Sequence, residues 1–189
     1  MPDMSARSLK AAAMQTDDST PKPALDEETI AFAGRVFQLA RSGYAAELGE
    51  LLRMGLPANL RNDKGDTLVM LAAYHGHTEA VRLLLDHGAD VEIANDRGQT
   101  PLAAAAFKGA LDTMVVLLDH GAQVDGAGPD GRTALMTAAM FNRTDAVDLL
   151  LSRGADPARR DASGHTAETI ARAMSAPDTP DQLARAATA

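Results

Sequence analysis

Cysteine is absent from this chain of 189 residues. Its absence excludes disulfides, thiolate nucleophiles and every zinc site that needs sulfur, and it favours a reducing compartment. Long apolar runs are also lacking near the start, where the longest extends only from Ala11 to Met14. A signal-peptide core or a membrane span needs more residues than that. We therefore expect a soluble, cytoplasmic protein with no membrane partner.

A surplus of positive charge is missing as well. The chain has 26 acidic and 18 basic residues, which gives a formal net charge of −8, and the basic residues are scattered. A chain of this charge repels the phosphate backbone, so we expect no nucleic-acid partner. The length and the 46% hydrophobic content favour one folded unit preceded by a leader. Abundant alanine and the excess of arginine over lysine favour a bacterial origin.

Residues 1–25 differ from the rest of the chain in composition. Polar residues, together with Pro21 and Pro23, interrupt every apolar period there. This pattern predicts a disordered leader. Order is expected to begin at Asp26, whose side chain can cap a helix that has Glu27 and Glu28 in its first turn.

Beyond the leader, the sequence repeats itself at an offset of 33 residues without gaps. The segments "GDTLVMLAAYHGHTEAVRLLLDHGAD", "GQTPLAAAAFKGALDTMVVLLDHGAQ" and "GRTALMTAAMFNRTDAVDLLLSRGAD" begin at Gly65, Gly98 and Gly131. A period of this length is typical of stacked supersecondary units, each too small to bury a core alone.

The coincident positions predict a helix-turn-helix unit. Thr100 followed by Pro101 is an N-cap followed by a proline at the first helical position, and the threonine recurs in the other units. Alanine pairs in the first helix allow close approach of a neighbour, and the second helix carries leucines. Between the helices stand Gly76, Gly109 and, in the third unit, Asn142, which tolerates a left-handed backbone. Further glycines follow each second helix as C-terminal caps, at Gly88, Gly121 and Gly154.

This frame, G-x-T-P-L, A-A, G-H and L-L-x-x-G-A-D, resembles the ankyrin repeat. The resemblance implies an all-α solenoid of stacked helix-turn-helix units, joined by hairpin-like turns, with a concave binding surface. Full repeats are expected at 62–94, 95–127 and 128–160, an N-terminal capping repeat at 26–61 and a C-terminal one at 161–189. Glu168 and Arg172, at otherwise apolar or alanine positions, suit a terminal repeat with one face in water.

One departure from the family concerns the histidine that usually follows Thr-Pro-Leu. Met70, Ala103 and Met136 stand in its place. In the family this histidine is expected to bond across neighbouring turns. Its replacement predicts that apolar packing joins the loops instead.

The histidines do not form a recognised site. His77 occupies the place where ankyrins usually have histidine after the turn glycine, and the other units have Ala110 and Arg143 there. His87 and His120 precede the helix-capping glycines and have a framework interpretation too. No further ligands stand at zinc-site spacing, and no catalytic triad, phosphate loop or cofactor fingerprint is present. We predict no catalytic residue, no metal and no cofactor.

A stripe of large side chains ends the three first helices. Tyr74, Phe107 and Met140 are equivalent by register and, with their followers His75, Lys108 and Phe141, face the concave side in the ankyrin frame. Two interpretations stay open: exposed contacts for a partner, or rings that fold sideways onto the next repeat. Mixed charge at the tips suits a polar rim, with Asp63, Lys64, Asp66, Asp96, Arg97, Gln99, Asp130 and Arg132.

We therefore predict a non-catalytic, monomeric module that binds another protein. An alternative within binding is a regulatory subunit or inhibitor that occludes an enzyme's site. A rival from another class is a metal-dependent hydrolase built around His75 and His77. A third possibility is an oligomer that buries its own stripe.

Overall fold

The computed structural model of the chain describes residues 26–187, so the predicted leader lies outside the described residues. Ten helices form in that range and no strand, apart from an isolated bridge between Arg61 and Thr67. The all-α prediction is therefore confirmed. The helices are α2 (Glu27–Ser42), α3 (Ala45–Arg53), α4 (Leu68–His75), α5 (Thr78–Asp86), α6 (Pro101–Lys108), α7 (Leu111–Asp119), α8 (Ala134–Met140), α9 (Thr144–Ser152), α10 (Ala167–Ala173) and α11 (Thr179–Ala186).

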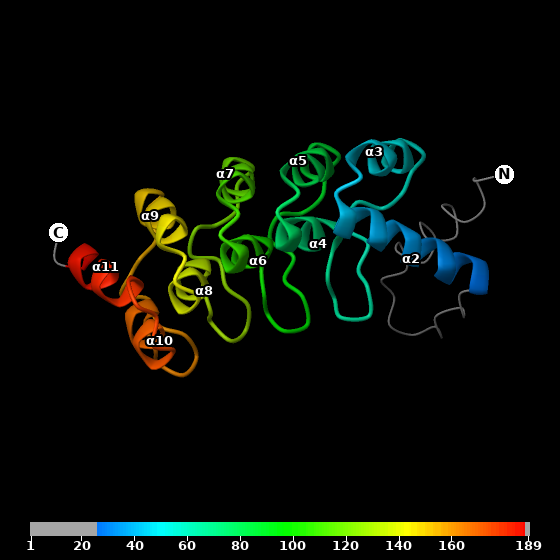
Figure 1. Ribbon diagram of the computed structural model, residues 1–189. Helices are drawn as coiled ribbons and strands as arrows, with labels where there is room; N and C mark the ends of the chain where they lie inside the picture. Colours follow the sequence, from blue (N-terminus) through cyan, green and yellow to red (C-terminus); the bar gives the residue numbers. More distant parts are fainter. Residues whose placement is uncertain (1–25, 188–189) are drawn as a thin grey trace.

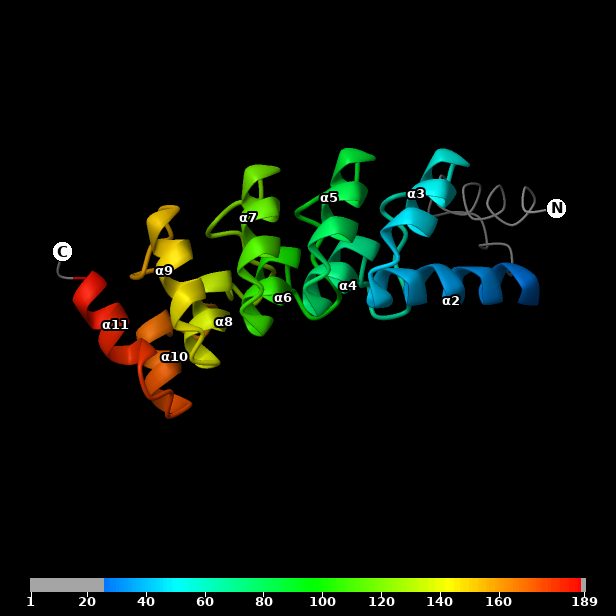
Figure 2. The same cartoon turned by 45° about the horizontal axis from the view of Figure 1, so that its top comes forward.

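The helices pair along the chain into a stack that advances from one end to the other (Figure 1). The first helices α2, α4, α6, α8 and α10 form one row, and the outer helices α3, α5, α7, α9 and α11 form the other (Figure 2). Loops extend from the first helices on the side away from the outer row, and we call their ends the tips. Within residues 26–187, no helix is long and apolar enough to cross a membrane.

Each first helix begins at a side-chain cap. The Asp26 carboxylate accepts a hydrogen bond of 2.7 Å from the Thr29 N–H, as its position before α2 predicts. Thr67, Thr100, Thr133 and Thr166 cap the other four first helices in the same way. These bonds satisfy amides that a helix leaves unpaired at its start, so the repeated threonines fix where each unit begins.

The turn between paired helices requires a left-handed backbone. Gly76 has a φ of 75°, Gly109 a φ of 72° and Asn142 a φ of 55°, as the sequence predicts. The turn also lies close to the next unit, because a Cβ placed on Gly109 would stand 3.3 Å from Cδ of Arg143. Two constraints therefore act on the glycine, one from its own φ and one from its neighbour.

The core lies between successive units. Leucines of the outer helices, such as Leu84, Leu117 and Leu150, are fully buried, and so are the alanine pairs of the first helices. Small alanines let the first helices approach one another, while the larger leucines fill the space behind them. Each unit is stabilised mainly by its two neighbours.

The tips are joined by polar bonds, so the prediction that apolar packing joins the loops is wrong. The Arg61 guanidinium lies 3.1 Å from Oδ1 of Asp96, and the Asp96 N–H donates to the Lys64 carbonyl at 3.1 Å. At the last junction, the Ala162 N–H donates to the Asp130 carbonyl at 2.8 Å. Backbone groups of the tips and the Arg61–Asp96 pair supply these bonds, whereas Met70 and Met136, at the first-helix positions, are buried.

The last repeat differs from the interior ones on its outward side. Arg172 in α10 makes a 2.9 Å ion pair with Glu168, at positions where the interior first helices carry apolar residues. On its inward side, the Thr179 hydroxyl donates to the Ala139 carbonyl at 2.7 Å, and the Gln182 amide donates to the Thr144 carbonyl at 3.0 Å. The repeat therefore docks on one side and presents charge to water on the other.

Candidate functional site

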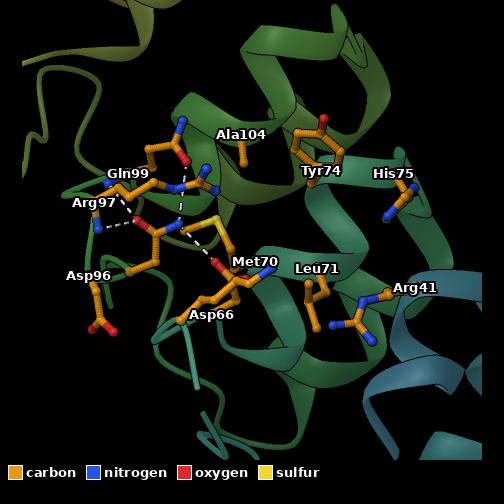
Figure 3. A pocket seen from close by; sticks show the side chains of 12 residues that line it. Arg41, Asp66, Met70, Leu71, Tyr74, His75, Asp96, Arg97, Gln99 and Ala104 are labelled. Carbon is orange, nitrogen blue, oxygen red and sulfur yellow. Dashed lines mark hydrogen bonds between the residues drawn. The ribbon is translucent and has the colours of Figure 1, made fainter. Parts of the chain in front are cut away.

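A groove runs along the stack between the tips and the first helices. Its larger part is a hollow of about 500 Å³ whose floor includes Leu71, Tyr74 and Ala104. Arg41 reaches this hollow from α2, and Arg97 and Gln99 reach it from the tip on the opposite side (Figure 3).

The tip wall of the hollow is organised by Asn95, which is buried. Its Nδ2 donates to Oδ1 of Asp66 at 2.8 Å and to Oε1 of Gln99 at 3.3 Å. Its Oδ1 accepts from the backbone N–H groups of Arg97 and Gln99 at 3.1 and 3.0 Å (Figure 3). The Asn95 side-chain amide thus links its own tip to the preceding tip and fixes the position of one relative to the other.

Asp66 departs from the expectation of a polar rim. It is only 8% exposed, and its second oxygen accepts from Nδ2 of Asn62 at 3.2 Å. Both carboxylate oxygens therefore have donors within the protein. Asp66 lines the hollow as part of the framework and has little surface left for a partner.

The floor of the groove carries a row of three rings, Tyr74, Phe107 and Phe141, which we call the ring row. The centroids of Tyr74 and Phe107 lie 5.4 Å apart with an interplanar angle of 13°. Phe107 and Phe141 meet edge-on, with centroids 4.5 Å apart. Tyr74 is nevertheless 39% exposed and Phe141 37% exposed. The rings join successive repeats, as one interpretation of the sequence expects, and they keep surface open to solvent, as the other requires.

The third ring comes from Phe141 and not from Met140, the residue equivalent to Tyr74 and Phe107 by register. Helix α8 ends at Met140, so Phe141 follows it as the C-cap. Met140 is half-buried and packs against the core. Phe141 is exposed like its equivalents His75 and Lys108, so the third ring comes from the position that follows Met140.

The histidine after the turn glycine joins two repeats. Nε2 of His77 lies 2.8 Å from the Arg41 carbonyl oxygen. Two repeats further on, Nε of Arg143 donates to the Phe107 carbonyl at 3.0 Å, which is the equivalent bond. Ala110, between them in register, has no side chain that could make it. His77 thus has a structural partner in the preceding repeat, which agrees with the framework interpretation.

The neighbouring His75 is exposed on the groove. Partial burial, and then the nearby His77, Lys108 and Arg41, lower the pKa of His75 below its usual value. Within residues 26–187, no three His, Cys, Asp or Glu side chains gather closely enough to hold a metal ion.

His87 and His120 serve their own helices. Nδ1 of His87 lies 2.8 Å from the Leu83 carbonyl, and Nδ1 of His120 lies 2.8 Å from the Val116 carbonyl. Each ring therefore satisfies a carbonyl near the end of its helix, which supports the framework interpretation.

A second hollow, of about 250 Å³, continues the groove towards the C-terminal repeats. Arg97 and Gln99 line both hollows, so the two form one groove. Phe107 and Phe141 line the second hollow, together with Met140, Asp130 and Arg132. Among the other predicted rim residues, Asp63 and Lys64 are exposed, Asp96 is held by Arg61, and Nζ of Lys108 lies 5.6 Å from the Tyr74 ring centroid.

Sequence reasoning missed several residues that shape the groove, among them Arg41 and Asn95. Arg41 stands 33 residues before Tyr74, so the repeat register, extended into the N-terminal repeat, could have found it. Asn95 stands 33 residues after Asn62, but the repeat pattern alone gives no indication that its amide reaches the preceding tip.

Comparison with known proteins places these features in a family. A family model described as ankyrin repeats, in three copies, matches residues 36–127 and again residues 88–161. An ankyrin repeat protein of Pseudomonas aeruginosa is 56% identical to the chain over 64 residues, which cover 34% of this chain and 37% of that protein. The chain thus spans little more than a third of the length of this curated relative.

Proposed function

The chain belongs to the ankyrin repeat family, and from this premise we propose that it is a non-catalytic cytoplasmic module that binds a partner protein along the groove. Contact would involve the ring row, its neighbours His75, Lys108 and Met140, and the tip residues around it. Ankyrin repeats are generally protein-interaction modules, which supports this function.

The observation that carries the proposal is the exposure of aromatic rings in a lined groove. Tyr74 and Phe141 each leave more than a third of their surface open while their other faces pack on Phe107. Rings held by a neighbour lose little further freedom when a partner covers them, and aromatic anchors of this kind dominate interface energies. The charged tips would form the polar rim around them.

The rigidity of the groove supports the same function. The Asn95 amide fixes two tips, and the bonds of His77 and Arg143 fix successive helix ends. A preformed surface leaves most of the ordering cost to the partner. An enzyme could be such a partner, in which case the module would act as a regulatory subunit or inhibitor.

A pair of tyrosine variants tests the proposal. Tyr74 lies in the groove, whereas Tyr44 is 54% exposed at the start of α3, outside the groove lining. Immobilised wild type, Tyr74→Ala and Tyr44→Ala would each be incubated with an extract of the cells that make the protein. We expect a partner captured by wild type and Tyr44→Ala to bind Tyr74→Ala more weakly by about 1–3 kcal/mol, as an interface anchor does.

Thermal melts of the same preparations provide the stability control. Loss of the Tyr74 stack on Phe107 should cost about 0.5–1.5 kcal/mol of folding stability beyond the lost burial, which leaves the variant folded at the capture temperature. Capture that is equal for all three proteins would show that the groove is not the binding surface.

A further inference from the structure

Five basic side chains surround the groove. Arg41, Lys64 and Arg97 line the first hollow, Arg132 lines the second, and Lys108 lies over the Tyr74 ring. Across residues 26–187, none of the five has a carboxylate within the 4.0 Å of an ion pair. Arg132 acts electrostatically on Asp161 and helps to lower the pKa of that carboxyl, while the charges of the other four are open to a ligand.

The carboxylates that line the groove already have donors. Asp66 accepts from the side chains of Asn62 and Asn95. Asp96 is paired with Arg61, and Oδ1 of Asp130 accepts from the backbone N–H of Arg132. The acidic groups of the groove are thus partly used by the framework, while its basic groups are not.

Charge is also separated between the two rows of helices. The first helices α4, α6 and α8 contain no Asp or Glu, whereas the outer helices α3, α5, α7 and α9 contain two each. Much of the net charge of −8 therefore belongs to the outer face. An acidic ligand would be repelled from that face and attracted to the groove.

The spacing of Lys64 and Arg97 matches an extended chain, whereas the third repeat has Asp130 at the equivalent position and Arg132 two positions further on. Lys64 and Arg97 occupy equivalent positions in successive repeats, which lie roughly 10 Å apart, the distance of packed helices. In the polyproline II conformation an extended peptide advances about 3.1 Å per residue with three residues per turn, so every third side chain would face the groove about one repeat further on. Intervening apolar side chains would lie on the ring row.

This inference rests on the proposed function and specifies its partner. We propose that the groove binds an acidic, extended segment of the partner protein, with Asp or Glu at about every third position and apolar side chains between them. The acidic groups pair with Lys64, Arg97 and Arg132, and an apolar side chain covers Tyr74.

Peptide selection tests the proposal. A displayed library of random twelve-residue peptides would be selected on the full chain, and the selected peptides measured by fluorescence anisotropy. The variants are Arg97→Glu in the groove and Arg82→Glu on α5, an exposed residue of the outer row with the same change of charge. Within residues 26–187, the Arg97 side chain makes no hydrogen bond, and only its backbone N–H donates to Oδ1 of Asn95.

We expect the selected peptides to be enriched in Asp and Glu at every third position. Arg97→Glu should bind these peptides about tenfold or more weakly than wild type, and Arg82→Glu should bind them within about twofold of wild type. Peptides that depend on Tyr74 but show no acidic enrichment would overturn this inference and leave the proposed function standing. Selected peptides indifferent to both Tyr74 and Arg97 would overturn both.

Two other occupants are distinguished by the same preparations. A light-scattering mass of a dimer whose groove admits no peptide would identify a second copy as the occupant and overturn the proposal. Displacement of the selected peptide by a single-stranded oligonucleotide of equal or higher affinity would do the same in favour of nucleic acid.

Discussion

A missing bond between two repeats predicts a stabilising substitution. The residue after the turn bonds the preceding repeat at His77 and at Arg143, but at Ala110 between them it cannot. The carbonyl equivalent to those of Arg41 and Phe107 is that of Tyr74. Ala110→Arg should place Nε against the Tyr74 carbonyl, in the geometry of the 3.0 Å bond made by Arg143.

The expected gain is small and can be bounded. A hydrogen bond of this kind contributes about 0.5–1.5 kcal/mol net. Ordering the arginine side chain opposes it by up to about 1.5–2 kcal/mol if the chain is fully fixed, and by less on an open surface. Apolar contact of the stem with Gly76, whose Cβ position lies 3.4 Å from Cβ of Ala110, offsets part of this cost. We expect a net stabilisation of about 0.5 kcal/mol.

Urea unfolding at neutral pH measures the effect, with Ala110→Met as the matched control for the stem without its donor. Ala110→Arg should unfold at a higher urea concentration than Ala110→Met, and His77→Ala should unfold at a lower concentration than wild type by about 1 kcal/mol. If arginine and methionine at position 110 give equal stability, the bond of Arg143 contributes nothing and the reasoning fails.

Four further predictions concern other parts of the chain. Asn95→Ala should lose about 2–4 kcal/mol in urea unfolding, because four hydrogen bonds disappear; a loss below about 1 kcal/mol would contradict its role at the tips. Gly128→Ala should destabilise the protein by about 1–3 kcal/mol, because the added Cβ would collide with the Gly98 backbone. The control Gly34→Ala, whose Cβ would stand in open space on α2, should stabilise the protein by about 0.5–1 kcal/mol. If both substitutions changed the stability in the same direction, this contrast would be refuted. Hydrogen bonding by the His165 N–H lowers the pKa of Asp161, so this carboxylate stabilises the fold above its ordinary pKa of 3.8 and stops doing so as pH falls through the folded pKa. On acidification to about pH 3, Asp161→Asn should therefore lose less stability than wild type. Equal losses for the two proteins would count against this role of Asp161. Deleting residues 1–20 should leave the melting temperature nearly unchanged, and a large decrease would show that they contribute to the fold.

The fold could be predicted because its determinants are local and repeated. The caps at Thr67, Thr100 and Thr133 and the left-handed turn at Asn142 are set by residue type, and each has the predicted geometry. Three copies of one pattern also fix the period, so the stacking follows from the sequence.

The candidate site was less predictable because it depends on contacts between repeats. The sequence places Tyr74 and Phe107 at equivalent positions, but the edge-on contact of Phe141 with Phe107 depends on how the two repeats pack. The burial of Asp66 depends on an amide from Asn95, 29 residues away. The sequence of one repeat does not show which of its side chains contact another repeat.

The outward side of α10 is charged where the interior first helices are apolar. Glu168 and Arg172 stand at the positions of Leu135 and Ala139, and we expect their charges to disfavour a junction with a second molecule at this end. Such a junction would be heterologous and would generate open filaments, since nothing closes it. Restoring the interior residues with Glu168→Leu and Arg172→Ala should make the end adhesive, and a light-scattering mass that rises with concentration would reveal the filaments. We thus expect the ion pair of Glu168 and Arg172 to act against end-to-end assembly, although its own energetic value is small.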